Sequence, residues 1–146
     1  MKISTKGRYG LRALVDMAAN TEGKPISLIS IAKRQNISLN YLEQVFGTLR
    51  KAGIITSTKG SSGGYLIKGE AKDITVKESL TALEGEFSIV DRNDGEMQDP
   101  LQLAIQTLLW DEIDQRVNAL LEARTLEQLV EEYKQMKDQG NQMFYI

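Results

Sequence analysis

The sequence contains neither cysteine nor histidine in its 146 residues. Without thiols it can form no disulfide, no catalytic thiolate and no cysteine-ligated iron–sulfur cluster, and zinc sites of the cysteine/histidine type are excluded as well. The side chain most used for acid–base catalysis near neutral pH is also missing. An enzyme would depend on carboxylates, Lys, Ser or Tyr alone, and we find no such constellation. We therefore expect no enzyme, no metal and no cofactor.

Long apolar runs are also missing. No stretch approaches the roughly 20 apolar residues that a membrane-spanning helix needs. Residues 1–8 have no apolar core of the kind that a secretory signal carries. We therefore expect a cytoplasmic protein with no membrane partner. Its length fits one compact domain, or a small domain with an accessory element.

Acidic residues are scarce in the first half of the chain and basic residues are scarce in the second half. The formal net charge of −2 conceals this asymmetry. Residues 1–68 carry 11 Lys/Arg and 3 Asp/Glu, a net charge of +8, whereas residues 69–146 carry 7 and 17, a net charge of −10. These charges either solubilise both halves, or the basic half binds phosphates of a nucleic acid. We favour the second interpretation, and expect the acidic half to lie away from a duplex.

Residues 27–68 have the pattern of a winged helix-turn-helix. Ser27 is predicted to cap a helix that ends near Arg34, and Ser38 to cap a second helix with apolar residues at helical spacing. A strand over residues 54–58, a Gly-rich turn over 59–64 and a strand over 65–68 follow. A nucleotide-binding loop would open a helix instead. The predicted fold is mainly α with a small β wing, and its second helix would enter the major groove of DNA.

Further helices are predicted on either side of this motif. Thr5 is expected to cap a helix that runs to about Asn20, and Thr75 with Glu78 forms a capping box. Asp99 and Pro100 start a long helix. The predicted organisation is a winged helix-turn-helix DNA-binding domain over residues 1–85, a loop over 86–98, dimerisation helices over 99–137 and a C-terminal tail over 138–146.

The long helix carries a wide apolar stripe. A stripe of that width can serve two surfaces, the small domain and a second subunit, or it can cover one core. We favour a homodimer, because helix-turn-helix proteins usually contact two half-sites. The residues predicted to form the dimer contact are Leu101, Ile105, Leu108, Leu109, Ile113, Val117 and Leu120.

The recognition helix presents polar side chains that suit base edges. Asn40 and Gln44 share one face and their amides can pair with adenine, while Glu43 can accept a hydrogen bond from cytosine. The alternative for Glu43 is a salt bridge to Lys33 or Arg50. Tyr41 is either a phosphate contact or a half-buried support. The predicted DNA-binding residues are Lys6, Arg8, Tyr9, Ser38, Asn40, Tyr41, Glu43, Gln44, Arg50, Lys51 and Lys59.

Large apolar residues follow the polar stretch at 138–142, namely Met143, Phe144, Tyr145 and Ile146. Such residues are unusual in a terminal segment, because termini tend to be polar and loose. We expect them to be buried, either on the protein's own dimer or as a peptide ligand whose terminal carboxylate is captured by a partner.

Several motifs together resemble the Rrf2 family of bacterial winged-helix regulators. They are the stretch from Thr5 to Gly10, the stretch from Tyr41 to Gln44, Ala52-Gly53-Ile54 and Gly63-Gly64-Tyr65. The resemblance covers about the first 85 residues. It implies a homodimer in which the long helix crosses its twin, bound to a pseudo-palindromic operator. Iron–sulfur members carry three cysteines in the loop that corresponds to residues 88–100, so a cluster-sensing role does not carry over.

The final four residues resemble the CymR-type branch of this family, which also lacks those cysteines. That resemblance implies a transcriptional repressor of cysteine metabolism that pairs with O-acetylserine sulfhydrylase (cysteine synthase). Ile146 would mimic the C-terminal isoleucine of serine acetyltransferase, and O-acetylserine would expel it and relieve repression. Two alternatives remain open: a regulator that senses a small molecule directly, and a protein-interaction adaptor that no longer binds DNA.

Overall fold

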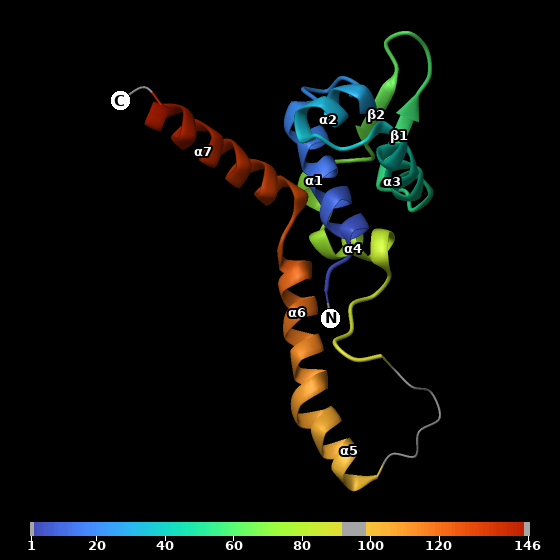
Figure 1. Ribbon diagram of the computed structural model, residues 1–146, viewed down its shortest axis with the longest axis vertical. Helices are drawn as coiled ribbons and strands as arrows, with labels where there is room; N and C mark the ends of the chain where they lie inside the picture. Colours follow the sequence, from blue (N-terminus) through green and yellow to red (C-terminus); the bar gives the residue numbers. More distant parts are fainter. Residues whose placement is uncertain (1, 92–98, 145–146) are drawn as a thin grey trace.

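The protein, seen in a computed structural model that describes residues 2–91 and 99–144, is mainly helical with a small β hairpin (Figure 1). For residues 142–144 only the backbone is described. The elements are α1 (Thr5–Asn20), α2 (Leu28–Gln35), α3 (Leu39–Lys51), β1 (Ile55–Thr58), β2 (Gly64–Ile67), the short 3-10 helix η1 (Ala71–Asp73), α4 (Val76–Glu84), α5 (Pro100–Ile105), the π-helical turn η2 (Gln106–Trp110), α6 (Asp111–Ala123) and α7 (Leu126–Phe144). The predicted fold class is confirmed.

Serine side chains cap the first three helices. Ser27 and Ser38 accept hydrogen bonds from the first turns of α2 and α3, as predicted. The cap of α1 is Ser4, whose hydroxyl accepts from the Gly7 amide at 3.1 Å, so the prediction of Thr5 is wrong by one residue. Ser4 has the extended backbone that a cap needs, whereas Thr5 is already helical.

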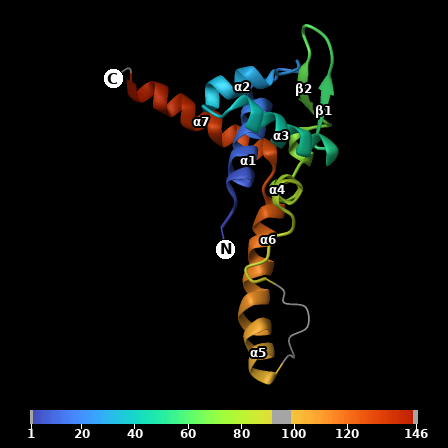
Figure 2. The same ribbon diagram turned by 45° about the vertical axis from the view of Figure 1, so that its right-hand side comes forward.

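Helices α1 to α4 and the hairpin enclose one apolar core (Figures 1 and 2). Each helix contributes one face, as its apolar spacing predicts. Phe46 of α3 packs against the Tyr65 ring of β2, with centroids 5.3 Å apart. The fully buried side chains include Leu14, Met17, Ile31, Leu42, Val45, Phe46, Leu49, Ile55 and Leu126.

The hairpin is tied to the segment before α2. β1 and β2 pair in antiparallel fashion from Ile55–Ile67 to Thr58–Gly64, and residues 59–63 form the tip of the wing. Ile26 and Tyr65 exchange two backbone hydrogen bonds of 3.0 and 2.9 Å. A Cβ on Gly64 would lie 2.5 Å from the Ile26 carbonyl oxygen, so only glycine permits this close approach.

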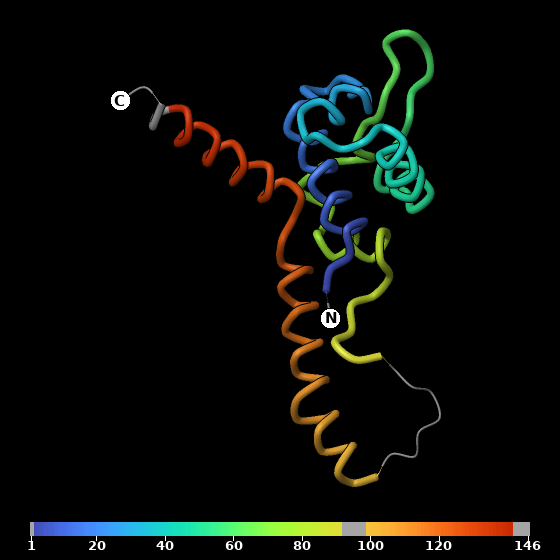
Figure 3. The backbone as a smooth tube through the Cα atoms, in the orientation of Figure 1, coloured from blue at the N-terminus to red at the C-terminus, as the bar shows by residue number. Residues whose placement is uncertain are grey.

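The segment from α5 through η2 to α6 forms one long rod that leaves the core at α4 (Figures 1 and 3). Asp99 caps it and Pro100 occupies its first turn, as predicted. The rod contains a π-helical turn that the sequence did not indicate. Asp114 of α6 holds the segment after α4, because its carboxylate accepts from the Ile89 amide at 2.7 Å and from the Ser88 hydroxyl at 2.9 Å.

Helix α7 packs against α1 through Leu126 and Val130 and then extends away from the core (Figures 1 and 2). It runs to Phe144, so the last helix is longer than predicted and includes residues 138–144 of the predicted tail. Residues 138–142 disfavour a helix mainly at Gly140, at a cost of about 1 kcal/mol, which the long preceding helix tolerates. Tyr145 and Ile146 lie outside the described residues.

None of the helices in the described ranges is long and apolar enough to cross a membrane.

Candidate nucleic-acid interface

The outer face of α3 is polar and exposed. Asn40, Glu43 and Gln44 are exposed, while Leu42 and Val45 on the opposite face are buried. The helix therefore uses one side for the core and leaves amide and carboxylate groups, three to four residues apart, pointing outward. Those groups match the donors and acceptors that bases present in the major groove.

Glu43 is available for such a contact. Among the ion pairs of the described residues, none involves Glu43, so the predicted alternative of a salt bridge to Lys33 or Arg50 is not observed. An unpaired carboxylate among cations is unfavourable next to a phosphate backbone. It becomes favourable opposite a base amino group. Base contact by Glu43 stays a prediction, which its exposure permits.

The first turn of α3 is held against α1 by two aromatic rings. Tyr9 and Tyr41 meet edge to face, with centroids 6.3 Å apart and planes at 90°. Tyr41 is half-buried and packs on the core, which agrees with the prediction of a support. Tyr9 is 40% exposed, and the Arg8 guanidinium carbon lies 6.0 Å from its ring. The contact brings the basic start of α1 next to the recognition helix.

The predicted cations surround this face from different elements. Lys6 is half-buried, and Arg8, Arg50, Lys51 and Lys59 are exposed. None of these five forms an ion pair within residues 2–91 and 99–144. Lys59 belongs to the wing, which projects at the end of the body opposite the start of α1 (Figures 1 and 2). The predicted cations thus come from α1, from the end of α3 and from the wing, and their contacts with a duplex backbone stay a prediction.

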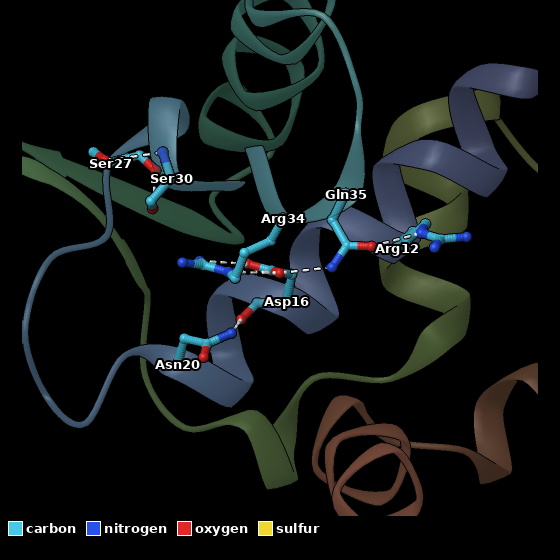
Figure 4. A network of polar contacts seen from close by, with 7 residues as sticks. All are labelled: Arg12, Asp16, Asn20, Ser27, Ser30, Arg34 and Gln35. Carbon is cyan, nitrogen blue, oxygen red and sulfur yellow. Dashed lines mark hydrogen bonds and ion pairs between the residues drawn. The ribbon is translucent and has the colours of Figure 1, made fainter. Parts of the chain in front are cut away.

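Sequence reasoning missed a buried polar network behind this face (Figure 4). Asp16 of α1 is only 3% exposed, and its carboxylate accepts from Arg34 Nη2 at 2.7 Å, from Arg34 Nε at 3.0 Å and from Gln35 Nε2 at 2.7 Å. The Gln35 side-chain oxygen accepts from Arg12 Nε at 2.6 Å. The signal in the sequence was a carboxylate on the apolar stripe of α1, beside Ala13 and Met17.

This network also shifts the pKa of Arg34. The hydrogen bond to Asp16 raises the pKa of the Arg34 guanidinium, burial opposes the shift, and the negative charge of Asp16 and the nearby Tyr133 of α7 add to it. A guanidinium is charged at physiological pH even without this shift.

Residues 3–132 match the family model Rrf2, which is described as an iron-dependent transcriptional regulator. The sequence is 36% identical over 145 residues to the HTH-type transcriptional regulator IscR of Escherichia coli strain K12, covering 97% of this chain and 88% of that relative.

Two solved structures have a similar fold. The structure of CymR (YrzC), the global cysteine regulator of B. subtilis, gives a TM-score of 0.77 at 38% identity and covers 90% of this chain and 97% of that chain. The oxidized form of Staphylococcus aureus CymR gives a TM-score of 0.72 at 40% identity, with the same coverage.

The iron in the family's description does not fit this sequence. An iron–sulfur cluster needs thiolate or imidazole ligands, and the chain contains neither cysteine nor histidine. The described residues also hold no group of three or more acidic side chains that could bind a metal ion. The residues agree with CymR-like relatives rather than with cluster-binding ones.

Proposed function

The chain belongs to the Rrf2 family of transcriptional regulators, and we propose that it is a homodimeric, sequence-specific repressor of cysteine or sulfur metabolism genes. We propose further that complex formation with cysteine synthase (O-acetylserine sulfhydrylase), through the segment 143–146, modulates it in the cytoplasm. The observation that carries the DNA-binding role is α3, whose polar outer face is exposed above a buried inner face in the basic half of the chain.

In this proposal α3 supplies the specificity and the flanking cations supply most of the affinity. Asn40, Glu43 and Gln44 contact base edges in the major groove. Arg50 and Lys51 lie in the last turn of α3, where they can contact phosphates without opposing the helix dipole. Lys59 on the wing enters the adjacent minor groove in this proposal.

The proposed dimer is supported by the apolar surface of the rod. Leu101 is 71% exposed and Leu108 is 80% exposed, and Leu103, Leu109 and Leu120 are about half exposed. A monomer that displays so many large apolar side chains on one element is unfavourable, and such surfaces usually bind a partner. A twin rod has the same apolar surface and the isologous symmetry that two operator half-sites require. Ile113 and Val117 are half-buried against the core side.

The role in cysteine metabolism is supported by the CymR structures and by the lack of cluster ligands. The proposed partner segment begins in the last residues of α7, and residues 131–139 of that helix are exposed. The side chains of Met143 and Phe144 and all of Tyr145 and Ile146 lie outside the described residues, so their contact with cysteine synthase is a proposal based on sequence alone.

A regulator that senses a small molecule directly would need a pocket between the winged domain and the rod. The cavity there, between α4 and α6, is lined by Leu80, Phe87 and Leu121 and has a volume of about 150 Å³. Ligand pockets usually measure about 300 to 1,000 Å³, so this space is small for a metabolite. A protein-interaction adaptor that does not bind DNA would not need the exposed amides on α3 or the exposed cations of the basic half.

The DNA-binding role can be tested by selecting a preferred duplex from a random pool with the purified protein. We expect a pseudo-palindromic site, whose binding weakens steeply with salt because several phosphates are contacted. Fluorescence anisotropy at several salt concentrations measures this dependence. Failure to select any duplex, or an affinity that does not change with salt concentration, would exclude the proposed function.

The partner can be tested separately by deleting residues 144–146. We expect the deletion to abolish co-purification with cysteine synthase and to leave binding of the selected duplex by the free regulator nearly unchanged. O-acetylserine should release the full-length regulator from the enzyme. Undiminished association after the deletion would exclude this segment as the contact.

A further inference from the structure

The Asp16–Arg34 pair joins α1 to the end of α2, with the Asp16 side chain buried and the Arg34 side chain 38% exposed (Figure 4). Within the part of the chain that the structure describes, Asp16 is the only charged residue that is buried. We propose that Asp16 and Arg34 are positioning residues for sequence-specific DNA recognition, because they fix α2, and through it the recognition helix α3, relative to α1. This inference rests on the proposed DNA-binding function and adds residues that make no contact with DNA.

Helix α2 is eight residues long and has one fully buried side chain, Ile31, with Leu28 and Ala32 partly buried against the core. These contacts lie on one face, so they resist lifting of the helix more than they resist a change in its direction. Its first end is held by the backbone bridge between Ile26 and Tyr65. Its last two residues, Arg34 and Gln35, both bind Asp16, so the network holds the other end.

The connection from α2 to α3 is too short to absorb a displacement. Asn36 adopts a left-handed conformation with φ of 54°, and the Ile37 amide donates to the Ala32 carbonyl at 3.2 Å. Ser38 already caps α3, and Asn40 follows two residues later. A change in the angle of α2 therefore acts directly on the first turn of α3, which carries Asn40 and is held on its other side by the Tyr9–Tyr41 contact with α1.

The chemistry of the pair suits this task. Arg34 contacts both carboxylate oxygens of Asp16 with Nε and Nη2, and such a planar fork fixes direction as well as distance. Buried ion pairs add little net stability, since desolvation offsets the attraction, but they can fix geometry. Gln35 extends the network to Arg12, so two turns of α1 hold the end of α2.

The decisive variant is Arg34→Lys, which keeps the charge but loses the fork. Asp16→Asn is the second variant, and Lys33→Gln, which removes an exposed charge one position away, is the control. Each full-length protein is titrated by fluorescence anisotropy against the duplex that the wild type selects and against an unrelated duplex of equal length. Melting curves confirm that each variant is folded at the assay temperature.

We expect Arg34→Lys to raise the Kd for the selected duplex about tenfold, since tenfold corresponds to one well-placed hydrogen bond. The Kd for the unrelated duplex should stay within about twofold, with an unchanged salt dependence, because no phosphate contact is lost. Lys33→Gln should change the Kd values for the selected and the unrelated duplex by the same factor. Equal weakening on both duplexes with a shallower salt dependence would make Arg34 a phosphate contact and overturn the proposal, as would unchanged binding.

A second readout needs no DNA and keeps this test separate from that of the proposed function. Amide hydrogen exchange at residues 36–41 should be faster in Arg34→Lys than in the wild type and unchanged in Lys33→Gln. If the wild type selects no duplex, the proposed function fails, but hydrogen exchange still tests whether the Asp16–Arg34 pair fixes the position of α3. Unaltered exchange in Arg34→Lys would show that the pair does not position α3.

Discussion

Leu108 offers the sharpest test of the proposed dimer. It lies in the π-helical turn of the rod and is 80% exposed in the single chain. Replacing Leu108 with Ala should therefore leave the folded protomer almost unaffected, because little of the side chain is buried there. The same replacement should weaken association strongly if the twin rod covers this residue.

The expected size follows from the exposed fraction. Burying a whole leucine side chain contributes about 1.5 to 3 kcal/mol, and four-fifths of Leu108 remains to be buried, so each copy contributes roughly 1 to 2.5 kcal/mol. A two-fold interface loses this contribution twice, or about 2 to 5 kcal/mol. The dimer dissociation constant should then rise by roughly 1.5 to 3.5 orders of magnitude.

Sedimentation velocity over a range of protein concentrations measures this shift, and urea unfolding of the monomer checks the fold. Ile29→Ala is the matched control, since Ile29 is also a large aliphatic residue that is 55% exposed, but it lies on α2. The reasoning is refuted if Leu108→Ala associates like the wild type, or if Ile29→Ala dissociates to the same extent.

Other substitutions test the interface and the packing. Asn40→Ala should weaken the binding free energy for the selected duplex by about 1 to 3 kcal/mol and change binding of unrelated DNA little. Lys51→Gln should weaken binding of both duplexes and lower the slope of log K against log salt concentration by about one, as measured by anisotropy. Gly64→Ala should lower the free energy of unfolding by about 1 to 3 kcal/mol, because its Cβ would meet the Ile26 backbone at 2.5 Å. Gly47→Ala in α3 should raise the free energy of unfolding by about 0.5 to 1 kcal/mol, since a Cβ there meets nothing within 4 Å. Urea unfolding measures both variants, and a change of the same sign in Gly64→Ala and Gly47→Ala would contradict this packing.

Local patterns predicted most of the winged domain. Serine caps, the Thr75–Glu78 capping box and helical spacing are short-range signals, and the structure confirms them at α2, α3 and α4. The cap of α1 was misplaced because Ser4 and Thr5 are both good capping residues. Only the backbone conformation separates them.

Contacts between distant residues were not predictable in the same way. The pairing of Asp16 with Arg34 joins residues on two helices, and no spacing rule connects them. The end of α7 was missed because Gly140 and the polar residues around it resemble a linker, although they continue a helix. The recognition-helix assignments are consistent with exposure, but their contacts to bases remain predictions.

The π-helical turn at Gln106–Trp110 has a consequence for the length of the rod. Its wide turn adds one residue relative to an α-helix, with the Asp111 amide donating to the Gln106 carbonyl. A regular α-helix of the same residues would rotate α6 by about 100° relative to α5, since each residue turns an α-helix by that angle. The wide turn absorbs the extra residue, so the side of α6 that rests on α4 and the apolar side of α5 keep their present alignment. A chain one residue shorter at this point could wind regularly with the same partner geometry, whereas a regular helix of the present length would need a different one.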